Sequence, residues 1–212
     1  MKFDNFLKKV GNSPVIEAES LLIGIPDPLP VKVQLSRWCK TGKLIQVRRG
    51  IYLLSEAYRK KNIYEPYLAS LLKKPSYISL EKALEYHGMI PEAVMVFTCI
   101  TTKRPTQFTS KAGTFRYRHI KRELFWGYES VKVDGQTGFI ALPEKALLDL
   151  IYFRGMKISQ PWLRELRLQN TKQLNMERLS DFAKKFKSPG MLKAYMEIKR
   201  YIEAYGEEAK TL

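Results

Sequence analysis

Hydrophobic residues near the start of the chain recur with the spacing of helices. In FDNFLKKV, residues 3–10, the apolar positions fall at i, i+3, i+4 and i+7, which predicts one short helix. Ser13 then occupies the position of a helix N-cap, with Pro14 at the first helical position, so we expect a second helix from there to about Ile23. The prolines of IPDPLP, residues 25–30, end that helix.

A third helix is predicted for VKVQLSRWCKTG, residues 31–42, and its two faces differ. One face carries Val31, Leu35, Trp38 and Cys39. The opposite face carries Val33, Ser36, Arg37 and Lys40. Such a helix has an apolar back and a polar, basic front, so it can pack on a core while it presents charge to a partner.

After Gly42 the pattern changes to that of strands. KLIQVRRGIYLL, residues 43–54, predicts two short strands joined at Arg48, Arg49 and Gly50, because glycine permits the backbone of a tight turn. Helices followed by a small hairpin are the layout of a winged helix-turn-helix, in which one helix enters the major groove of DNA and the hairpin lies against an adjacent groove or the backbone. The IPDPLP connection is longer than the roughly 3–4 residues of an ordinary helix-turn-helix.

Helical and strand patterns alternate through the remainder of the chain. Helices are expected at 64–74, 79–88 and 142–155, strands at 94–101, 115–120 and on both sides of the DGQTG turn, and helices again from 160 to 205. Ser79 is expected to cap the second of these helices. We therefore predict an α+β protein, with an N-terminal winged helix-turn-helix domain (residues 1–57) followed by a mixed α/β domain that ends in a helical tail (residues 58–212).

The charge balance favours a polyanionic partner. The chain has 212 residues, of which 37 are Lys or Arg and 21 are Asp or Glu, and its formal net charge is +16. A protein this basic attracts nucleic acid or an anionic membrane surface. The excess is not confined to one end of the chain, since residues 1–60 hold 11 basic and 5 acidic residues and the rest of the chain holds 26 and 16.

Cysteine and histidine usage restricts the chemistry. Cys39 and Cys99 are too few for a disulfide framework or a structural zinc site, and they favour a reducing compartment. His87 and His119 are the only histidines, so we expect no metal centre and no cofactor. No stretch approaches the roughly 20 apolar residues of a membrane span, and the N-terminus lacks the apolar core of a signal peptide. We expect a cytoplasmic protein without a membrane partner.

Four segments occur in an order that resembles a known family. GKLIQVRRGIYLL is followed by YISLEKALEYHGMI, FRYRHIKRELFWG and GFIALPEKALLDLIYF. Together they resemble the AbiEi-type antitoxins of the AbiE (type IV) toxin–antitoxin systems of bacteria and archaea. The resemblance spans about residues 5–155, and SLEKALEYHG and ALPEKALLDL are its most specific segments.

The resemblance implies a transcriptional regulator with two parts. Its N-terminal winged helix would bind inverted repeats in its own promoter, as double-stranded DNA, and repress the operon. Its C-terminal domain would be needed to counter a nucleotidyltransferase-like toxin, either by direct contact or indirectly. The oligomeric state stays open, because two copies on a two-fold site and separate monomers on each repeat would both serve.

The expected DNA-binding residues come from the third helix and the hairpin. They are Lys32, Gln34, Ser36, Arg37, Lys40, Lys43, Arg48 and Arg49. Residues on the helix face can reach base edges or phosphates, since arginine can bind guanine with two hydrogen bonds. Lys43, Arg48 and Arg49 are expected to contact phosphates, which would steepen the salt dependence of binding. Trp38 and Tyr52 are expected in the core.

A second basic region is expected in the C-terminal domain. It consists of Lys103, Arg104, Arg116, Arg118, Lys121 and Arg122. Arg116 and Arg118 alternate along a predicted strand and should share one face of it. This region would extend the DNA footprint or meet an acidic partner, unless it is only the soluble surface of a basic protein.

Several polar residues of the C-terminal domain suggest an enzyme acting on nucleic acid. They are Glu81, His87, Glu144, Lys145 and Asp149. We interpret them as structural, because Glu144 would lie in the first turn of a helix, where a carboxylate is favoured. No phosphate-binding glycine loop, carboxylate cluster or activated nucleophile accompanies them. We therefore expect no catalytic residues. The alternatives to a DNA-binding antitoxin are such an enzyme and a module that only binds a protein.

Overall fold

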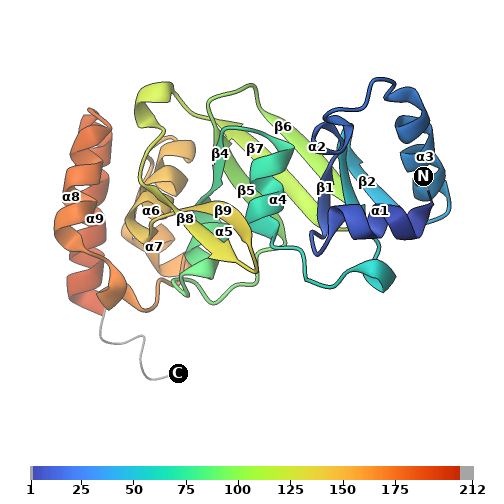
Figure 1. The fold of residues 1–212 in the computed structure, drawn as a ribbon. Helices are drawn as coiled ribbons and strands as arrows, with labels where there is room; N and C mark the ends of the chain where they lie inside the picture. Colours follow the sequence, from blue (N-terminus) through green and yellow to red (C-terminus); the bar gives the residue numbers. More distant parts are fainter. Residues whose placement is uncertain (1, 206–212) are drawn as a thin grey trace.

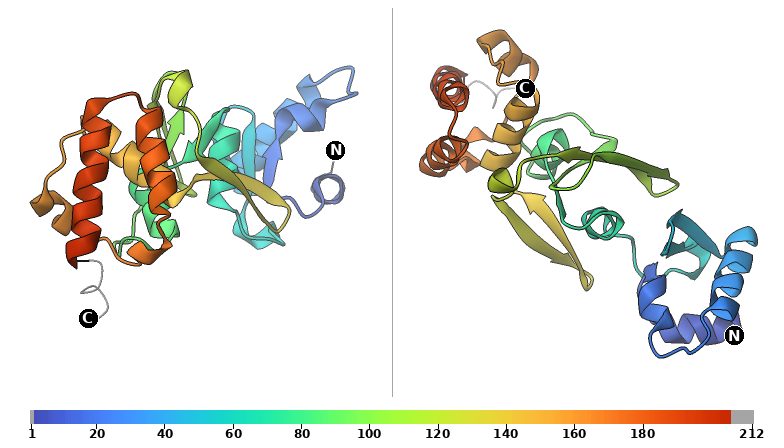
Figure 2. Two further views of the ribbon diagram at one scale, coloured as in Figure 1. Left: turned by 90° about the vertical axis from the view of Figure 1, so that its left-hand side faces the viewer. Right: turned by 90° about the horizontal axis from the view of Figure 1, so that it is seen from above.

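The computed structural model describes residues 2–205, which form an elongated molecule with three parts (Figure 1). A small unit of helices and strands, built from the N-terminal residues, lies at one end. A large sheet occupies the middle, and the last helices of the described chain form the other end. Figure 2 shows the same arrangement from two further directions.

The N-terminal unit combines helices with a small antiparallel sheet. Its elements are α1 (Phe3–Val10), β1 (Val15–Glu17), α2 (Ala18–Leu22), α3 (Leu29–Lys40), β2 (Leu44–Arg48) and β3 (Ile51–Leu54). The strands are ordered β1-β3-β2, so β3 pairs with a strand on each side. The first predicted helix, the helix after IPDPLP and the hairpin are confirmed.

The prediction of a helix from Ser13 to about Ile23 is wrong in its first half. Val15 and Ile16 begin strand β1, and helix α2 starts only at Ala18. β-Branched side chains fit a strand better than a helix, and both side chains are buried where β1 pairs with β3. The hydroxyl of Ser13 donates to the carbonyl of Val15 at 2.6 Å, so it caps no helix.

The central sheet is mixed. Its strands are β4 (Ser76–Ile78), β5 (Val96–Thr101), β6 (Thr106–Ser110), β7 (Gly113–His119), β8 (Tyr128–Val133) and β9 (Gln136–Ala141), in the order β6-β7-β5-β4-β9-β8. β4 is parallel to β9 and β5 to β7, and the other neighbours are antiparallel. The sequence pattern predicts β5, β7, β8 and β9. It misses β4, which has three residues, and β6, whose only apolar residue is Phe108.

Helices cover both faces of the sheet and extend beyond it. They are α4 (Glu65–Leu72), α5 (Leu80–Tyr86), α6 (Pro143–Phe153), α7 (Gln160–Glu165), α8 (Met176–Lys185) and α9 (Pro189–Tyr205). The hydroxyl of Tyr117 donates to Ala69 of α4 at 2.6 Å, whereas that of Tyr77 donates to Asp149 of α6 at 3.0 Å. The predicted α+β class is confirmed. Residues 206–212 of the predicted tail lie outside the described residues.

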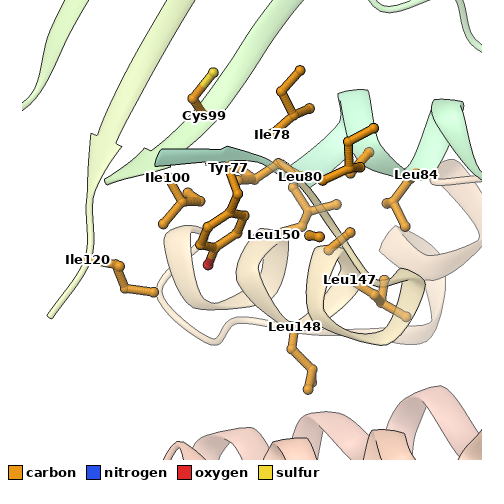
Figure 3. Packing of buried hydrophobic residues seen from close by; sticks show 14 of the residues in the cluster. Tyr77, Ile78, Leu80, Leu84, Cys99, Ile100, Ile120, Leu147, Leu148 and Leu150 are labelled. Atoms are coloured by element: carbon orange, nitrogen blue, oxygen red, sulfur yellow. The ribbon is translucent and has the colours of Figure 1, made fainter. Parts of the chain in front are cut away.

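The main core lies on both faces of the central sheet, against α4 on one face and against α6 on the other. Figure 3 shows Tyr77 and Ile100 pointing from their strands toward α6. The same cluster of buried side chains includes Val15, Ile51 and Leu53 of the small sheet. A second, smaller cluster fills the space under α1 and α3, and its members are Phe3, Phe6, Ile16, Ala18, Leu21, Leu35, Trp38, Leu44 and Leu54. The small sheet therefore contributes to both cores.

Candidate nucleic-acid interface

Helix α3 buries one face and exposes the other, as the sequence predicts. Leu35 is 0 % and Trp38 is 4 % exposed. The ring of Trp38 packs on Phe3 and Phe6 of α1, at centroid distances of 5.1 and 4.6 Å. Gln34 is half-buried. The exposed polar residues of the helix, which we call the α3 surface, are Lys32, Ser36, Arg37 and Lys40.

The charge of the α3 surface is entirely positive, because α3 contains no acidic residue. The helix begins slightly earlier than predicted, with Pro30 in its first turn, where a missing amide hydrogen costs no helical hydrogen bond. A side-chain oxygen of Asp27 accepts from the backbone amide of Leu29 at 3.0 Å and fixes that start. Figure 1 places α3 at the end of the molecule that is remote from α8 and α9.

Lys43 lies at the base of the hairpin, three residues after α3 ends. Its ammonium group is 4.6 Å from the centroid of the Phe3 ring. Its backbone amide donates to the carbonyl of Trp38, and its carbonyl accepts from Ser55. Lys43 therefore stands next to the last turn of α3, with its ammonium group over Phe3 of α1.

The hairpin tip contacts the rest of the chain. Arg48 donates through Nη1 to the carbonyl oxygen of Leu72 at the end of α4, and its guanidinium lies 6.0 Å from the ring centroid of Phe108 in β6. Arg49 is exposed beside it. Arg48 as a whole is also exposed, so the expected contact of the hairpin tip with DNA stays a prediction. Because a strand advances about 3.3 Å per residue, the tip of the hairpin lies roughly 13 Å along β2 from the base of that strand.

The second basic region does not form one patch. Arg116 and Arg118 share a face of β7, as predicted, while alternate residues of the strand are buried. Arg116 is exposed, whereas Arg118 lies 4.2 Å from the ring centroid of Phe153 in α6. Lys121 and Arg122 are exposed in the segment that follows β7.

Lys103 and Arg104 lie at the hairpin tip instead. They line a cavity of about 590 Å³ between the N-terminal unit and the central sheet. We call it the junction cavity, and its charged lining residues are Glu17, Glu19, Arg48, Arg49, Lys73, Lys74, Lys103 and Arg104. The structure thus brings members of both expected basic regions to one place.

Lys73 and Lys74 are members of this cavity that sequence reasoning missed. Lys74 pairs with Glu17 at 3.4 Å. Burial lowers the pKa of the Lys73 ammonium group, and the neighbouring charges of Arg48 and Lys103 lower it further. The only signal in the sequence is a KKP run at the end of a predicted helix, and such a run by itself indicates no more than a solvated helix end.

The residues considered for catalysis lie inside the fold. Glu144, Lys145 and Asp149 are each 0 % exposed. Lys145 donates to one carboxylate oxygen of Asp149, and the other accepts from the hydroxyls of Ser79 at 2.8 Å and Tyr77 at 3.0 Å. Ser79 occupies the N-cap position of α5, as predicted, but its hydroxyl donates to Asp149 and not to a backbone group of the helix. We call these four residues, Tyr77, Ser79, Lys145 and Asp149, the buried network.

Burial dominates the acid–base behaviour of this network. It raises the pKa of the Asp149 carboxyl group, although Lys145 and the two hydroxyls lower it. It also lowers the pKa of the Lys145 ammonium group, which lies 4.8 Å from the ring of Trp126. Because all of these groups are enclosed and bound to one another, their placement supports the structural interpretation.

Two of the other considered residues, Glu144 and His87, also make contacts within the chain. Glu144 lies in the first turn of α6, as expected, and both of its carboxylate oxygens bind the guanidinium of Arg178 at 3.0 Å. His87 has Nε2 at 2.8 Å from the carbonyl oxygen of Ala141. Glu81 is half-buried in the first turn of α5. These contacts join α5 and α6 to the rest of the domain.

The described residues hold neither a metal-binding cluster nor a membrane-spanning helix. No three His, Cys, Asp or Glu side chains of residues 2–205 lie close enough together to hold a metal ion. No helix in this range is both long enough and apolar enough to cross a bilayer.

Comparisons with known proteins add no family. The chain matches no model of a known protein family, and no curated protein matches it. The resemblance to AbiEi-type antitoxins therefore stays a prediction.

Proposed function

We propose that the protein is a DNA-binding transcriptional autorepressor that also serves as the antitoxin of a toxin–antitoxin operon. In this proposal the α3 surface enters the major groove of inverted repeats in its own promoter. The observation that carries the proposal is α3 itself. Its exposed polar side chains are cationic or neutral, and its opposite face is anchored on the aromatic core of the N-terminal unit.

The order of elements in the N-terminal unit supports the proposal. Helix α1, strand β1, the helices α2 and α3 and the β2–β3 hairpin follow one another as in winged helix-turn-helix proteins. In those proteins the second helix of the pair lies in the major groove. Because the hairpin tip is held against the central sheet, we assign groove binding to α3 and phosphate contacts at its end to Lys43.

The antitoxin part of the proposal depends on the AbiEi resemblance. Its most specific segments, SLEKALEYHG and ALPEKALLDL, supply Ser79, Lys145 and Asp149 of the buried network. Such segments determine how α5 and α6 pack on the sheet, and so they specify the fold of the domain that would counter the toxin. We propose a nucleotidyltransferase-like protein as that toxin.

The double substitution Arg37→Ala/Lys40→Ala is expected to weaken binding to the operon's own upstream duplex at least about tenfold, since a hydrogen bond to a charged group contributes on the order of 1.5 kcal/mol or more. Its plot of log K against log salt should also become shallower, by about 1 for each phosphate that is no longer neutralised. Fluorescence anisotropy over a series of salt concentrations measures both quantities.

The matched control is Lys172→Ala/Lys193→Ala, which removes the same charge from two exposed positions of the C-terminal helical part. It should bind the duplex as the unaltered protein does. Equal affinity of the α3 variant and the unaltered protein would reject the α3 surface as the interface. If the control variant bound the duplex as weakly as the α3 variant, the loss of affinity would be explained by net charge alone.

The antitoxin activity has its own experiment. Expression of the product of the adjacent gene should stop growth, and co-expression of this chain should restore it. Rescue by the Arg37→Ala/Lys40→Ala variant is expected as well, because the proposal places toxin neutralisation in the C-terminal domain. Failure of the unaltered chain to rescue growth would contradict this half of the proposal and leave the DNA-binding half standing.

A further inference from the structure

The junction cavity concentrates positive charge from distant parts of the sequence. Six of its lining residues are cationic, and they come from the hairpin tip, from the end of α4 and from the β5–β6 connection. They are Arg48, Arg49, Lys73, Lys74, Lys103 and Arg104. Because these six cations come from different elements, they lie together only where the N-terminal unit packs against the central sheet.

The acidic residues of the cavity do not neutralise this charge. Glu17 and Glu19 are its two carboxylates, against six cations. Glu17 is already paired with Lys74 at 3.4 Å. The lowered pKa of Lys73 has burial as its main cause, followed by repulsion from Arg48 and Lys103. Like charges held close together at a partly enclosed site repel, and a bound anion removes that repulsion.

The shape of the cavity favours a compact ligand. Its volume of about 590 Å³ lies within the range of small-molecule sites, roughly 300–1,000 Å³. Ile51 and Leu71 contribute apolar surface to its wall, and they are only 5 % and 7 % exposed. The hairpin contributes Gly50, whose backbone a ligand can approach closely because it has no side chain.

We propose that the junction cavity binds a compact organic polyphosphate, of the kind found in nucleoside di- and triphosphates. Arg49, Lys103 and Arg104 bind its phosphates, since a planar guanidinium can bind two phosphate oxygens at once and an ammonium group acts as a point charge. Six cations against two carboxylates suit a ligand with more than one phosphate, because each phosphate group adds negative charge. This inference does not depend on the proposed binding of DNA.

A ligand at this place would bridge the two units. Arg49 belongs to the hairpin of the N-terminal unit, and Lys103 and Arg104 belong to the central sheet domain. A ligand that binds only the folded protein raises its melting temperature with increasing ligand concentration. Saturable binding and this shift can therefore be measured on the full chain in the absence of DNA.

The experiment is isothermal titration with inorganic tripolyphosphate, with orthophosphate as the comparison. Tripolyphosphate should bind with one site per chain and more tightly than orthophosphate. Lys103→Ala/Arg104→Ala should weaken tripolyphosphate binding at least about tenfold, because the variant has two fewer cations to bind the phosphates. Within residues 2–205 neither of these side chains forms a hydrogen bond or ion pair, so the substitution breaks no such interaction of the fold.

Two further variants separate specific binding from a general effect of charge. Glu19→Gln removes a carboxylate from the cavity and should tighten tripolyphosphate binding about two- to fivefold. A variant that failed to fold would bind more weakly, so tighter binding cannot result from misfolding. The control Lys172→Ala/Lys193→Ala, outside the cavity, should leave tripolyphosphate binding unchanged.

Absence of saturable binding, or equal weakening in the control, would overturn the proposal. It would also be overturned if Lys103→Ala/Arg104→Ala weakened binding to duplex DNA but not to tripolyphosphate, because the cavity would then belong to the DNA interface. Loss of DNA binding in the α3 variant with normal tripolyphosphate binding would leave the cavity proposal intact.

Discussion

Asp149→Ala is expected to lower the free energy of unfolding by about 3–5 kcal/mol, the range for removing one partner of a buried ion pair. Asp149 is 0 % exposed, and its carboxylate accepts from Lys145, Ser79 and Tyr77. Without it the ammonium group of Lys145 remains enclosed with no opposite charge. Urea unfolding of the full chain, followed by circular dichroism, measures the change.

The surface pair of Asp181 and Lys184 is the matched control. Their charged atoms are 3.1 Å apart, but their side chains are 66 % and 64 % exposed. Asp181→Ala should therefore change the free energy of unfolding by no more than about 0.5 kcal/mol.

A double variant tests whether the enclosed charge is the cause. Lys145→Met/Asp149→Leu removes both charges and fills similar space, so it should lose less stability than Asp149→Ala alone. A double variant as unstable as the single one would show that packing, and not the unpaired ammonium group, is responsible.

Trp38→Ala is expected to destabilise the packing of α1 and α3 by about 3–5 kcal/mol, the usual cost of truncating a buried aromatic residue. Trp38 is 4 % exposed and touches the rings of Phe3 and Phe6. The cluster that it fills is the smaller of the two cores. Hydrogen exchange should accelerate in α1 and α3 and change little in β5 and β7.

Val33 provides the comparison on the same helix. It is apolar but 50 % exposed on the opposite face, so Val33→Ala should leave the exchange of α1 and α3 nearly unchanged. Similar acceleration in both variants would mean that loss of the aromatic contacts is not what destabilises α3, and helix propensity could not be the cause because alanine favours a helix more than valine or tryptophan does.

The amphipathic elements could be predicted because their pattern is local. The two faces of α3 follow from the order of residues along one helix, and burial of Leu35 and Trp38 agrees with it. The same holds for β7, where Arg116 and Arg118 fall on one face. In each case the spacing of apolar residues decides which side meets the core.

Other features depend on contacts between distant segments. Pro14, with Ser13 before it, has the chemistry of a helix start, but pairing with β3 makes the next residues a strand. Ser79 is the N-cap residue of α5, as its sequence position predicts, but the donation of its hydroxyl to Asp149 of α6 at 2.8 Å depends on a distant segment. The junction cavity is lined by four separate segments and needs one particular seating of the two units, which no local pattern specifies.

The contribution of the small sheet to both cores has a consequence for protein engineering. Val15, Ile51 and Leu53 fill space in the main core, although they belong to the first sixty residues. A chimera that transplanted only this segment onto another protein would expose these three side chains to water, at about 1.5–3 kcal/mol for each. A redesign of the α3 surface should therefore graft only the outer side chains of α3, with the scaffold behind them kept whole.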